Sequence, residues 1–140
     1  MREILFRGRD IAGNWHYGVP LIFTKDYVCI TAPHTYNKAV QPETVGQYTG
    51  LTDKYGKKIF EGDIVENDWC FMCGNSVIKF GQYKPLDMGN EYQQGHLGFY
   101  LEHIHKADKR SVRKDIVYFA NNCEIIGNIH DNPELLKGGE

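Results

Sequence analysis

The stretch "GQYTGLTDKYGKKIFEGDIV", from Gly46 to Val65, decides the fold of this chain. It contains three short runs of strand-forming residues separated by two breaks with the composition of turns. In the first break, "TDKYG", Asp53 can accept backbone N–H bonds and Gly56 can take a positive φ without a clash of a Cβ. In the second break, Gly62 permits a sharp bend that Asp63 ties to nearby backbone amides. The stretch therefore predicts architecture rather than ligand chemistry, and its glycines match no phosphate or dinucleotide loop.

The composition around this stretch is typical of a soluble, mainly β domain. The 140 residues are enough to bury a core without metal or disulfide staples. Nine Tyr, seven Phe, two Trp and fifteen Gly favour short strands joined by turns. The net charge of −2 creates no field that would draw the chain to nucleic acid or an anionic membrane. The start, "MREILFRGRD", resembles a strand rather than a signal peptide, so we expect a cytoplasmic location.

The alternation of apolar and polar residues predicts about ten short strands, built as meanders into a small, strongly bent barrel. Two of these are "SVIKFGQY" and "HLGFYLEHI", and a later one is "IVYFA". The segments "TAPHTYNKAVQPE" and "KPLDMGNEYQQG" have loop composition, and "HKADKRSVRKD" is expected to be a loop or a short exposed helix. Near the end, Asn132 as N-cap and Pro133 as first helical residue predict one short helix.

Three segments carry a resemblance to a known family. The opening "MREILFRGRD", the central "PETVGQYTGLTDKYGKKIFEGDIV" and the closing "EIIGNIHDNPELL" are similar, in this order, to the YopX family of small phage and prophage proteins. The resemblance implies a single YopX-like domain over residues 1–140. Its SH3-like β-barrel would lie within roughly residues 44–130, with additional N-terminal strands and long loops. Residues 66–122 carry no signature, and the resemblance implies no activity and no catalytic or binding residues.

Metal chemistry has two weak candidates in the sequence. "CFMC" supplies one pair of thiols, but a tetrahedral zinc site needs a second local pair, so free thiols are the expected state. His103 and His105 would share one face of a strand while Glu102 points away, which leaves a third ligand missing. We therefore expect no metal and no cofactor. The cysteines are Cys29, Cys70, Cys73 and Cys123.

Catalysis by carboxylates or by a nucleophile is not favoured either. Asp53, Glu61 and Asp63 lie close together, but they sit among three lysines and two of them have turn roles. This pattern is typical of a charge-paired surface. The chain also contains no GxSxG motif. We therefore expect a protein that is not an enzyme.

The best candidate for nucleic-acid binding is the basic run in "HKADKRSVRK". Its cations could contact phosphates, and Tyr83, Tyr92 and Tyr100 could offer stacking faces if they are exposed. Against this reading stand the acidic net charge and the fact that charge runs usually form solvated loops. The candidate residues are Lys106, Lys109, Arg110, Arg113 and Lys114.

The leading hypothesis is a phage or prophage accessory protein without enzymatic activity. It would bind a protein partner or assemble into a homo-oligomer through exposed strand edges and aromatic loops. The alternative is a nucleic-acid-binding module that uses residues 106–114.

Overall fold

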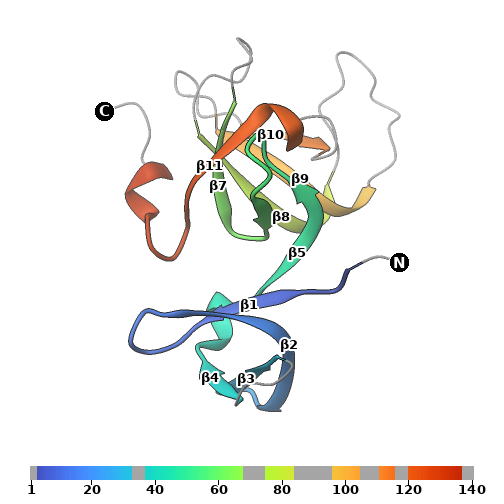
Figure 1. Cartoon of the computed structure of the whole chain (residues 1–140). Helices are drawn as coiled ribbons and strands as arrows, with labels where there is room; N and C mark the ends of the chain where they lie inside the picture. Colours follow the sequence, from blue (N-terminus) through green and yellow to red (C-terminus); the bar gives the residue numbers. More distant parts are fainter. Residues whose placement is uncertain are drawn as a thin grey trace. The chain divides into compact units, whose positions relative to one another are not determined.

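The computed structural model describes residues 3–32, 37–67, 75–83, 96–104, 111–115 and 120–136. Within these ranges the chain forms eleven strands and three short 3-10 helices, which confirms the mainly β class (Figure 1). The chain divides into two compact units, Met1–Gly50 and Leu51–Glu140. The strand pairs of the described residues form two antiparallel sheets and do not close into a ring. None of the described helices is long and apolar enough to span a membrane.

The first sheet has the strand order β4-β3-β2-β1-β5-β6, and its strands β1 to β4 belong to the first unit. One face of this sheet packs Val28, Ile30 and Val40 against Phe6 and Val45. The segment "TAPHTYNKAVQPE" was predicted to be a loop, but it contains a strand and a 3-10 helix. Its residues Lys38–Val40 form the strand because they pair with residues 28–30 of the strand before it. The elements are β1 (Phe6–Arg9), β2 (Trp15–Thr24), β3 (Tyr27–Thr31), β4 (Lys38–Val40), η1 (Pro42–Thr44) and β5 (Gly46–Thr52), whose last two residues belong to the second unit.

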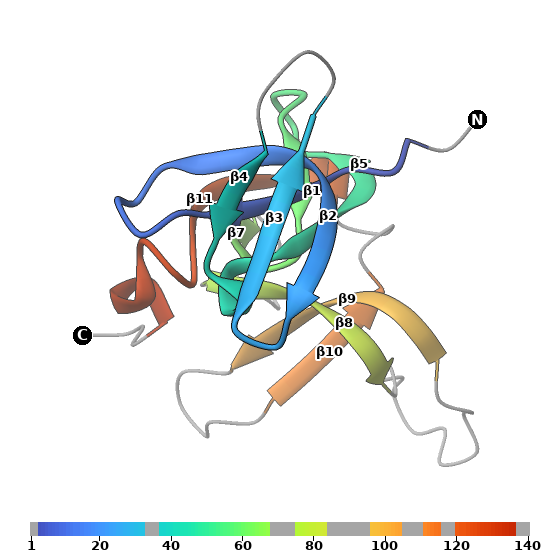
Figure 2. The same ribbon diagram turned by 90° about the horizontal axis from the view of Figure 1, so that it is seen from below.

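The second unit contains the sheet β10-β9-β8-β7-β11, in which β8, β9 and β10 run side by side (Figure 2). Its core consists of Ile59, Val65, Ile78, Leu101 and Cys123, each at most 1% exposed. The elements are β6 (Lys58–Phe60), β7 (Asp63–Asn67), β8 (Asn75–Tyr83), β9 (His96–Ile104), β10 (Ser111–Asp115), η4 (Ala120–Asn122), β11 (Cys123–Asn128) and η5 (Pro133–Leu136).

Two predictions for this unit were wrong in part. The segment Ser111–Asp115, expected to be a loop or a helix, is strand β10, because it pairs with β9 over its whole length. "IVYFA" was expected to be a strand, but Ala120 opens the 3-10 helix η4, and residues 116–119 lie outside the described ranges. The short helix expected after Asn132 is the 3-10 helix η5, and its N-cap stays a prediction.

The turn predicted at Asp53 is confirmed, and it does more than close a hairpin. Asp53 Oδ1 accepts the N–H groups of Tyr55 and Lys57, both at 2.9 Å, and Gly56 has a φ of 81°. Asp53 Oδ2 accepts the N–H of Ile125 at 3.1 Å, although Ile125 lies 72 residues further along the chain. The neighbouring N–H of Lys54 donates to the carbonyl of Cys123 at 3.0 Å. The turn is thereby fastened to strand β11.

The bend predicted at Gly62 and Asp63 is confirmed as well. Gly62 has a φ of 91°, and Asp63 Oδ2 accepts the N–H of Phe60 at 2.8 Å. The Gly62 backbone donates to the carbonyl of Ile78 and accepts from the N–H of Ile129, at 2.8 and 2.9 Å. The bend therefore joins β7 to both the β8 strand and the segment after β11.

Strand β11 ends in a tight polar loop that depends on Gly127. The β11–β7 register shifts between Ile125 and Gly127, which marks a β-bulge. A Cβ built on Gly127 would lie 2.5 Å from Asn132 Oδ1, which accepts the N–H of Asn128 at 3.3 Å. Asn128 Oδ1 in turn accepts the N–H of Asp131 at 2.9 Å. The closing segment of the chain is therefore shaped by packing and backbone hydrogen bonds.

The Asp53 carboxylate predicts a pH-dependent stability. Burial acts to raise the pKa of Asp53, but hydrogen bonds from the amides of Ile125, Lys57 and Tyr55 outweigh it, so the pKa lies below its ordinary value. The stabilisation is therefore full above the unfolded-state pKa of about 4 and is lost as the pH falls through the lower native pKa. Asp53→Asn keeps one oxygen but presents an NH₂ group to one N–H partner, so we expect a loss of about 1–3 kcal/mol at neutral pH.

Urea unfolding at several pH values measures this effect. The difference between wild type and Asp53→Asn should stay constant between about pH 7 and pH 5 and shrink below about pH 4. Asp26→Asn is the matched control, because Asp26 lies exposed in the turn between β2 and β3. An Asp53→Asn protein as stable as the wild type at pH 7 would contradict the role given to this carboxylate.

A second prediction concerns the space at Gly127. Gly127→Ala should lower the free energy of unfolding by about 1–3 kcal/mol, because the added methyl group overlaps the Asn132 side chain. In an Asn132→Ala background the same substitution should cost clearly less, since the closest atoms, Oδ1 and Cγ, are gone. A double-mutant cycle by urea unfolding measures the coupling, and equal costs in both backgrounds would refute the steric explanation.

Candidate interaction surface

The predicted nucleic-acid-binding residues lie mostly beyond what the structure describes. Lys106, Lys109 and Arg110 are outside the described ranges. Arg113 and Lys114 lie on β10, opposite Glu102 and Leu101 of β9 in the strand register. Strand β10 is the last strand on its side of the described sheet, so the two positions are at a sheet edge. A basic surface made by all five residues stays a prediction.

The predicted stacking faces and metal ligands find little support. Tyr100 is buried, with 9% of its surface exposed, so it offers no stacking face, and this part of the prediction was wrong. Tyr83 lies on β8, and Tyr92 is outside the described residues. His103 lies on β9, whereas His105 lies outside the description. Across the described ranges, His, Cys, Asp and Glu side chains form no group of three or more that could hold a metal ion.

The described cysteines are buried thiols. Cys29 and Cys123 are thiols rather than half-cystines and belong to different units, and Cys70 and Cys73 are not among the described residues. Burial, reinforced by the nearby charge of Asp53, raises the pKa of Cys123 to about 11. A thiol with such a pKa is protonated at neutral pH and is a poor nucleophile. Cys123 is therefore a packing residue of the core.

The carboxylates of the central stretch are buried, which corrects the expectation of a charge-paired surface there. Asp53 is 4% and Asp63 is 1% exposed, while Glu61 is half-buried. The carboxylates of Asp53 and Asp63 accept hydrogen bonds from backbone N–H groups. The sequence suggested a charge-paired surface because these acids sit among lysines in the chain. Three-dimensional packing instead uses the two aspartates to hold turns.

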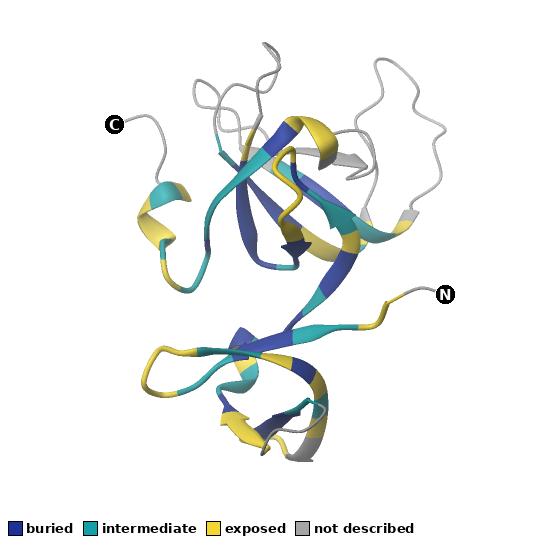
Figure 3. Cartoon of the chain, viewed as in Figure 1, coloured by how far each residue is buried: buried dark blue, intermediate teal, exposed yellow. Residues whose placement is uncertain are grey.

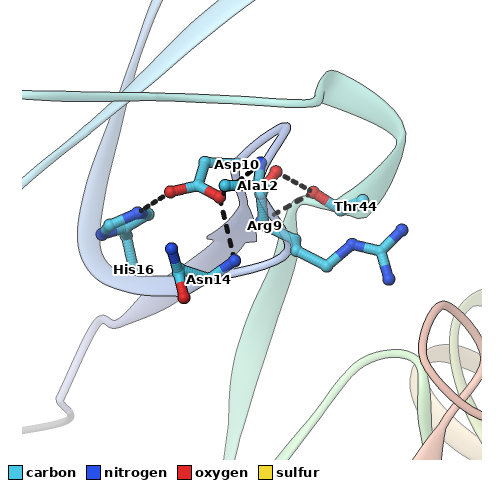
Figure 4. A network of polar contacts seen from close by, with 6 residues as sticks. All are labelled: Arg9, Asp10, Ala12, Asn14, His16 and Thr44. Atoms are coloured by element: carbon cyan, nitrogen blue, oxygen red, sulfur yellow. Dashed lines mark hydrogen bonds and ion pairs between the residues drawn. The ribbon is translucent and has the colours of Figure 1, made fainter.

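An Asp–His pair that the sequence did not predict lies in the β1–β2 hairpin (Figure 4). Asp10 Oδ2 is 2.7 Å from His16 Nε2, and this hydrogen bond is the main reason that the pKa of Asp10 lies below its ordinary value. Asp10 Oδ1 accepts the N–H groups of Ala12 and Asn14, both at 2.9 Å. The carboxylate therefore fixes the hairpin turn.

The hydroxyl drawn near this pair is not a nucleophile. Thr44 Oγ1 accepts the N–H of Arg9 at 2.8 Å and donates to the carbonyl of Gln41 at 2.6 Å, and Thr44 is only 2% exposed (Figure 4). An Asp–His pair is the orienting part of a hydrolytic triad, but such a triad needs an accessible hydroxyl or thiol that the imidazole activates. The hydrogen bonds of this network hold the β1–β2 turn and join Arg9 to Thr44 of η1.

A more distinctive feature is an apolar surface on β8 and β9, formed by Phe80, Leu97 and Phe99, which we call the β8–β9 strip. Phe80 is directly opposite Phe99 in the register, and Leu97 is opposite Gln82, two residues further along. Phe80 is 53% and Leu97 is 71% exposed. Figure 3 shows how buried, intermediate and exposed residues are distributed along the chain. The rings of the two phenylalanines meet edge to face, with centroids 4.9 Å apart. These neighbouring exposed apolar side chains are the candidate interaction surface of the second unit.

A second row of exposed apolar side chains lies on β2 in the first unit. Tyr17, Val19 and Leu21 alternate along the strand and are 48%, 48% and 43% exposed. They share one face with Arg7, whose guanidinium lies 4.6 Å from the ring centroid of Trp15. The Arg7 side chain is itself buried, at 6% exposure, so the exposed part of this row consists of Tyr17, Val19 and Leu21.

Comparison with known proteins adds a family but no activity. No curated protein matches this chain. The chain is similar to the crystal structure of protein EF1440 from Enterococcus faecalis, with 23% identity and a TM-score of 0.46, over 97% of this chain and 99% of that one. The family model described as "YopX protein" matches residues 19–137, which includes strands of both units. This chain belongs to the YopX family.

Proposed function

We propose that this chain is an accessory protein of a phage or prophage that binds a protein partner or a second copy of itself. The observation that carries the proposal is the β8–β9 strip, where Phe80 and Leu97 expose more than half of their surfaces in adjacent register positions. Apolar side chains in such positions gain free energy when a partner removes them from water. The cytoplasm of the bacterial host is the location that we infer for this activity.

The described polar clusters support a binding role over an enzymatic one. The carboxylates of Asp10, Asp53 and Asp63 hold backbone amides of turns. The Cys123 thiol is buried with a raised pKa. An enzyme needs titratable groups that face a substrate, and these four groups face their own chain. We therefore propose a function that depends on surface complementarity.

We also propose that the sheet of the second unit is an SH3-like barrel. Its strands follow the order of such barrels: β7 to β10 form a meander, and β11 returns to the free side of β7. The 3-10 helix η4 comes immediately before β11, as the short helix does before the last strand of an SH3-like barrel. Such barrels serve unrelated partners, so the fold supports a binding role without specifying a ligand.

Binding to a partner can be tested with the full chain. Light scattering after size exclusion should show a mass that rises with concentration, or affinity capture from phage-infected cells should retain a specific partner. Either result is expected because buried apolar area drives association. A strict monomer at all concentrations, with no protein retained above the level of a blank resin, would contradict the proposed function.

Nucleic-acid binding is the second candidate, because Arg113 and Lys114 lie on the edge strand β10 next to the rest of the basic run. If it applies, gel shifts with single- and double-stranded DNA should appear at low salt and weaken steeply as salt rises. The double substitution Arg110→Glu and Arg113→Glu should abolish them, whereas Lys25→Glu, an exposed lysine between β2 and β3, should not. The absence of any shift at low salt would eliminate this candidate.

A further inference from the structure

We propose that the β8–β9 strip is a docking site for a short, extended and apolar peptide segment of another protein. The inference rests on the proposed function, because it names the partner and the surface. The strip continues the inner face of the sheet: Ile78 and Leu101 are directly opposite each other and are 1% and 0% exposed. The next pair on this face is Phe80 and Phe99. Exposure therefore rises stepwise from the core to the far end of the hairpin, where Leu97 is 71% exposed.

The strip is already formed before any partner arrives. Strands β8 and β9 pair without a register shift from Ser76–His103 to Tyr83–His96, so the backbone under the strip has a complete ladder. The edge-to-face contact with Phe99 restrains the exposed ring of Phe80. A surface that is fixed in advance loses little conformational entropy on binding. A ligand can therefore dock by side-chain contacts alone.

The opposite face of the β8–β9 hairpin exposes different side chains from the strip. Lys79 and Glu102 belong to that face and form an ion pair at 3.0 Å. Gly81 and Gly98 are directly paired on it and contribute no side chains. Val77 and Tyr100 lie on the same face, but they are buried, at 8% and 9% exposure. The large exposed apolar side chains of the hairpin are therefore those of the strip, where Gln82 is their polar neighbour. The strip itself carries no formal charge, so it selects uncharged, apolar side chains.

The size of the strip decides between a peptide and a second folded copy. Phe80 and Leu97 together expose on the order of 200 Å² of apolar surface, taking 150–250 Å² as the area of a whole large side chain. A stable interface between folded proteins needs about 800 Å² from each partner. The strip supplies only a fraction of that area. A short peptide segment that buries two side chains needs far less area than a folded partner.

The spacing of the strip favours an extended ligand over a helical one. The Phe80–Phe99 pair and the Leu97 position are two residues apart along their strands, which corresponds to about 6.8 Å. Side chains on one face of an extended peptide repeat at the same interval. A helix instead presents neighbours on one face about 5–6 Å apart. Two apolar residues at positions i and i+2 of an extended segment would therefore lie over Phe80 and Leu97 together.

A selection from displayed random nonapeptides on the full chain tests this proposal. We expect enrichment of peptides with two large apolar residues at i and i+2 and no charge between them. Fluorescence anisotropy with the enriched, labelled peptides should show at least about tenfold weaker binding to Leu97→Ser and to Phe80→Ser. Leu21→Ser, a matched change at an exposed leucine of the β2 row, should leave binding unchanged. Thermal unfolding by circular dichroism verifies that each variant is folded.

Three outcomes would overturn the inference. Peptides that bind Leu97→Ser and Phe80→Ser as well as the wild type would show that the ligand docks elsewhere, and the proposed binding function would stand. A dimer in sedimentation that Leu97→Ser converts to a monomer would make a second copy the occupant, and that function would again stand. If no peptide is enriched, the proposed docking site is refuted. The proposed function is refuted as well only if affinity capture and light scattering both find no association.

Discussion

The second unit depends on one buried carboxylate. Asp53 is the point where the β5–β6 turn and strand β11 meet, because its two oxygens accept N–H groups from both. A carboxylate removed from water is costly unless hydrogen bonds replace its hydration. Here three backbone amides do so, and they also lower the pKa of the acid despite its burial. The need to satisfy this charge therefore determines how the turn and β11 are placed together.

The same principle recurs at other corners of the chain. Asp10 holds the amides of Ala12 and Asn14, and Asp63 holds the amide of Phe60. Short carboxylate side chains suit this task because they reach backbone N–H groups within a few residues. A chain with short strands has many turns, and each turn leaves amides that the strand ladders do not satisfy. Acidic residues that suggest catalysis in a sequence are here part of the framework.

Local features of the sequence predicted the local structure well. Asp53, Gly56, Gly62 and Asp63 have the roles expected of them, because turn geometry depends on only a few neighbouring residues. The partner of Asp53 in β11 was not predictable, because no periodicity links residues that are 72 positions apart. The β-bulge before Gly127 was missed for a similar reason, since it appears only in the register between two strands.

Burial was harder to predict than strand location. The alternation in β9 identifies Leu97, Phe99 and Leu101 as one face, but it does not say how far that face is covered. The structure covers Leu101 completely and leaves Leu97 exposed. Strand β10 was misread because its basic residues have the composition of a loop, whereas its partner β9 supplies the ladder that makes it a strand. Exposure depends on neighbours that are distant in sequence, so the candidate surface emerged only in three dimensions.

The two edges of the second sheet make association through strand faces more favourable than strand addition. On β11, the N–H of Ile125 and the carbonyl of Cys123 are already bonded to the Asp53 turn. On β10, the residues Arg113 and Lys114 lie at the edge, and charged residues disfavour edge-to-edge pairing. An incoming strand would therefore find one edge occupied and the other charged. On the β8–β9 strip the backbone is already paired, and Phe80 and Leu97 expose apolar side chains beside Gln82. Burial of these side chains is the mode of association that we propose for the second unit.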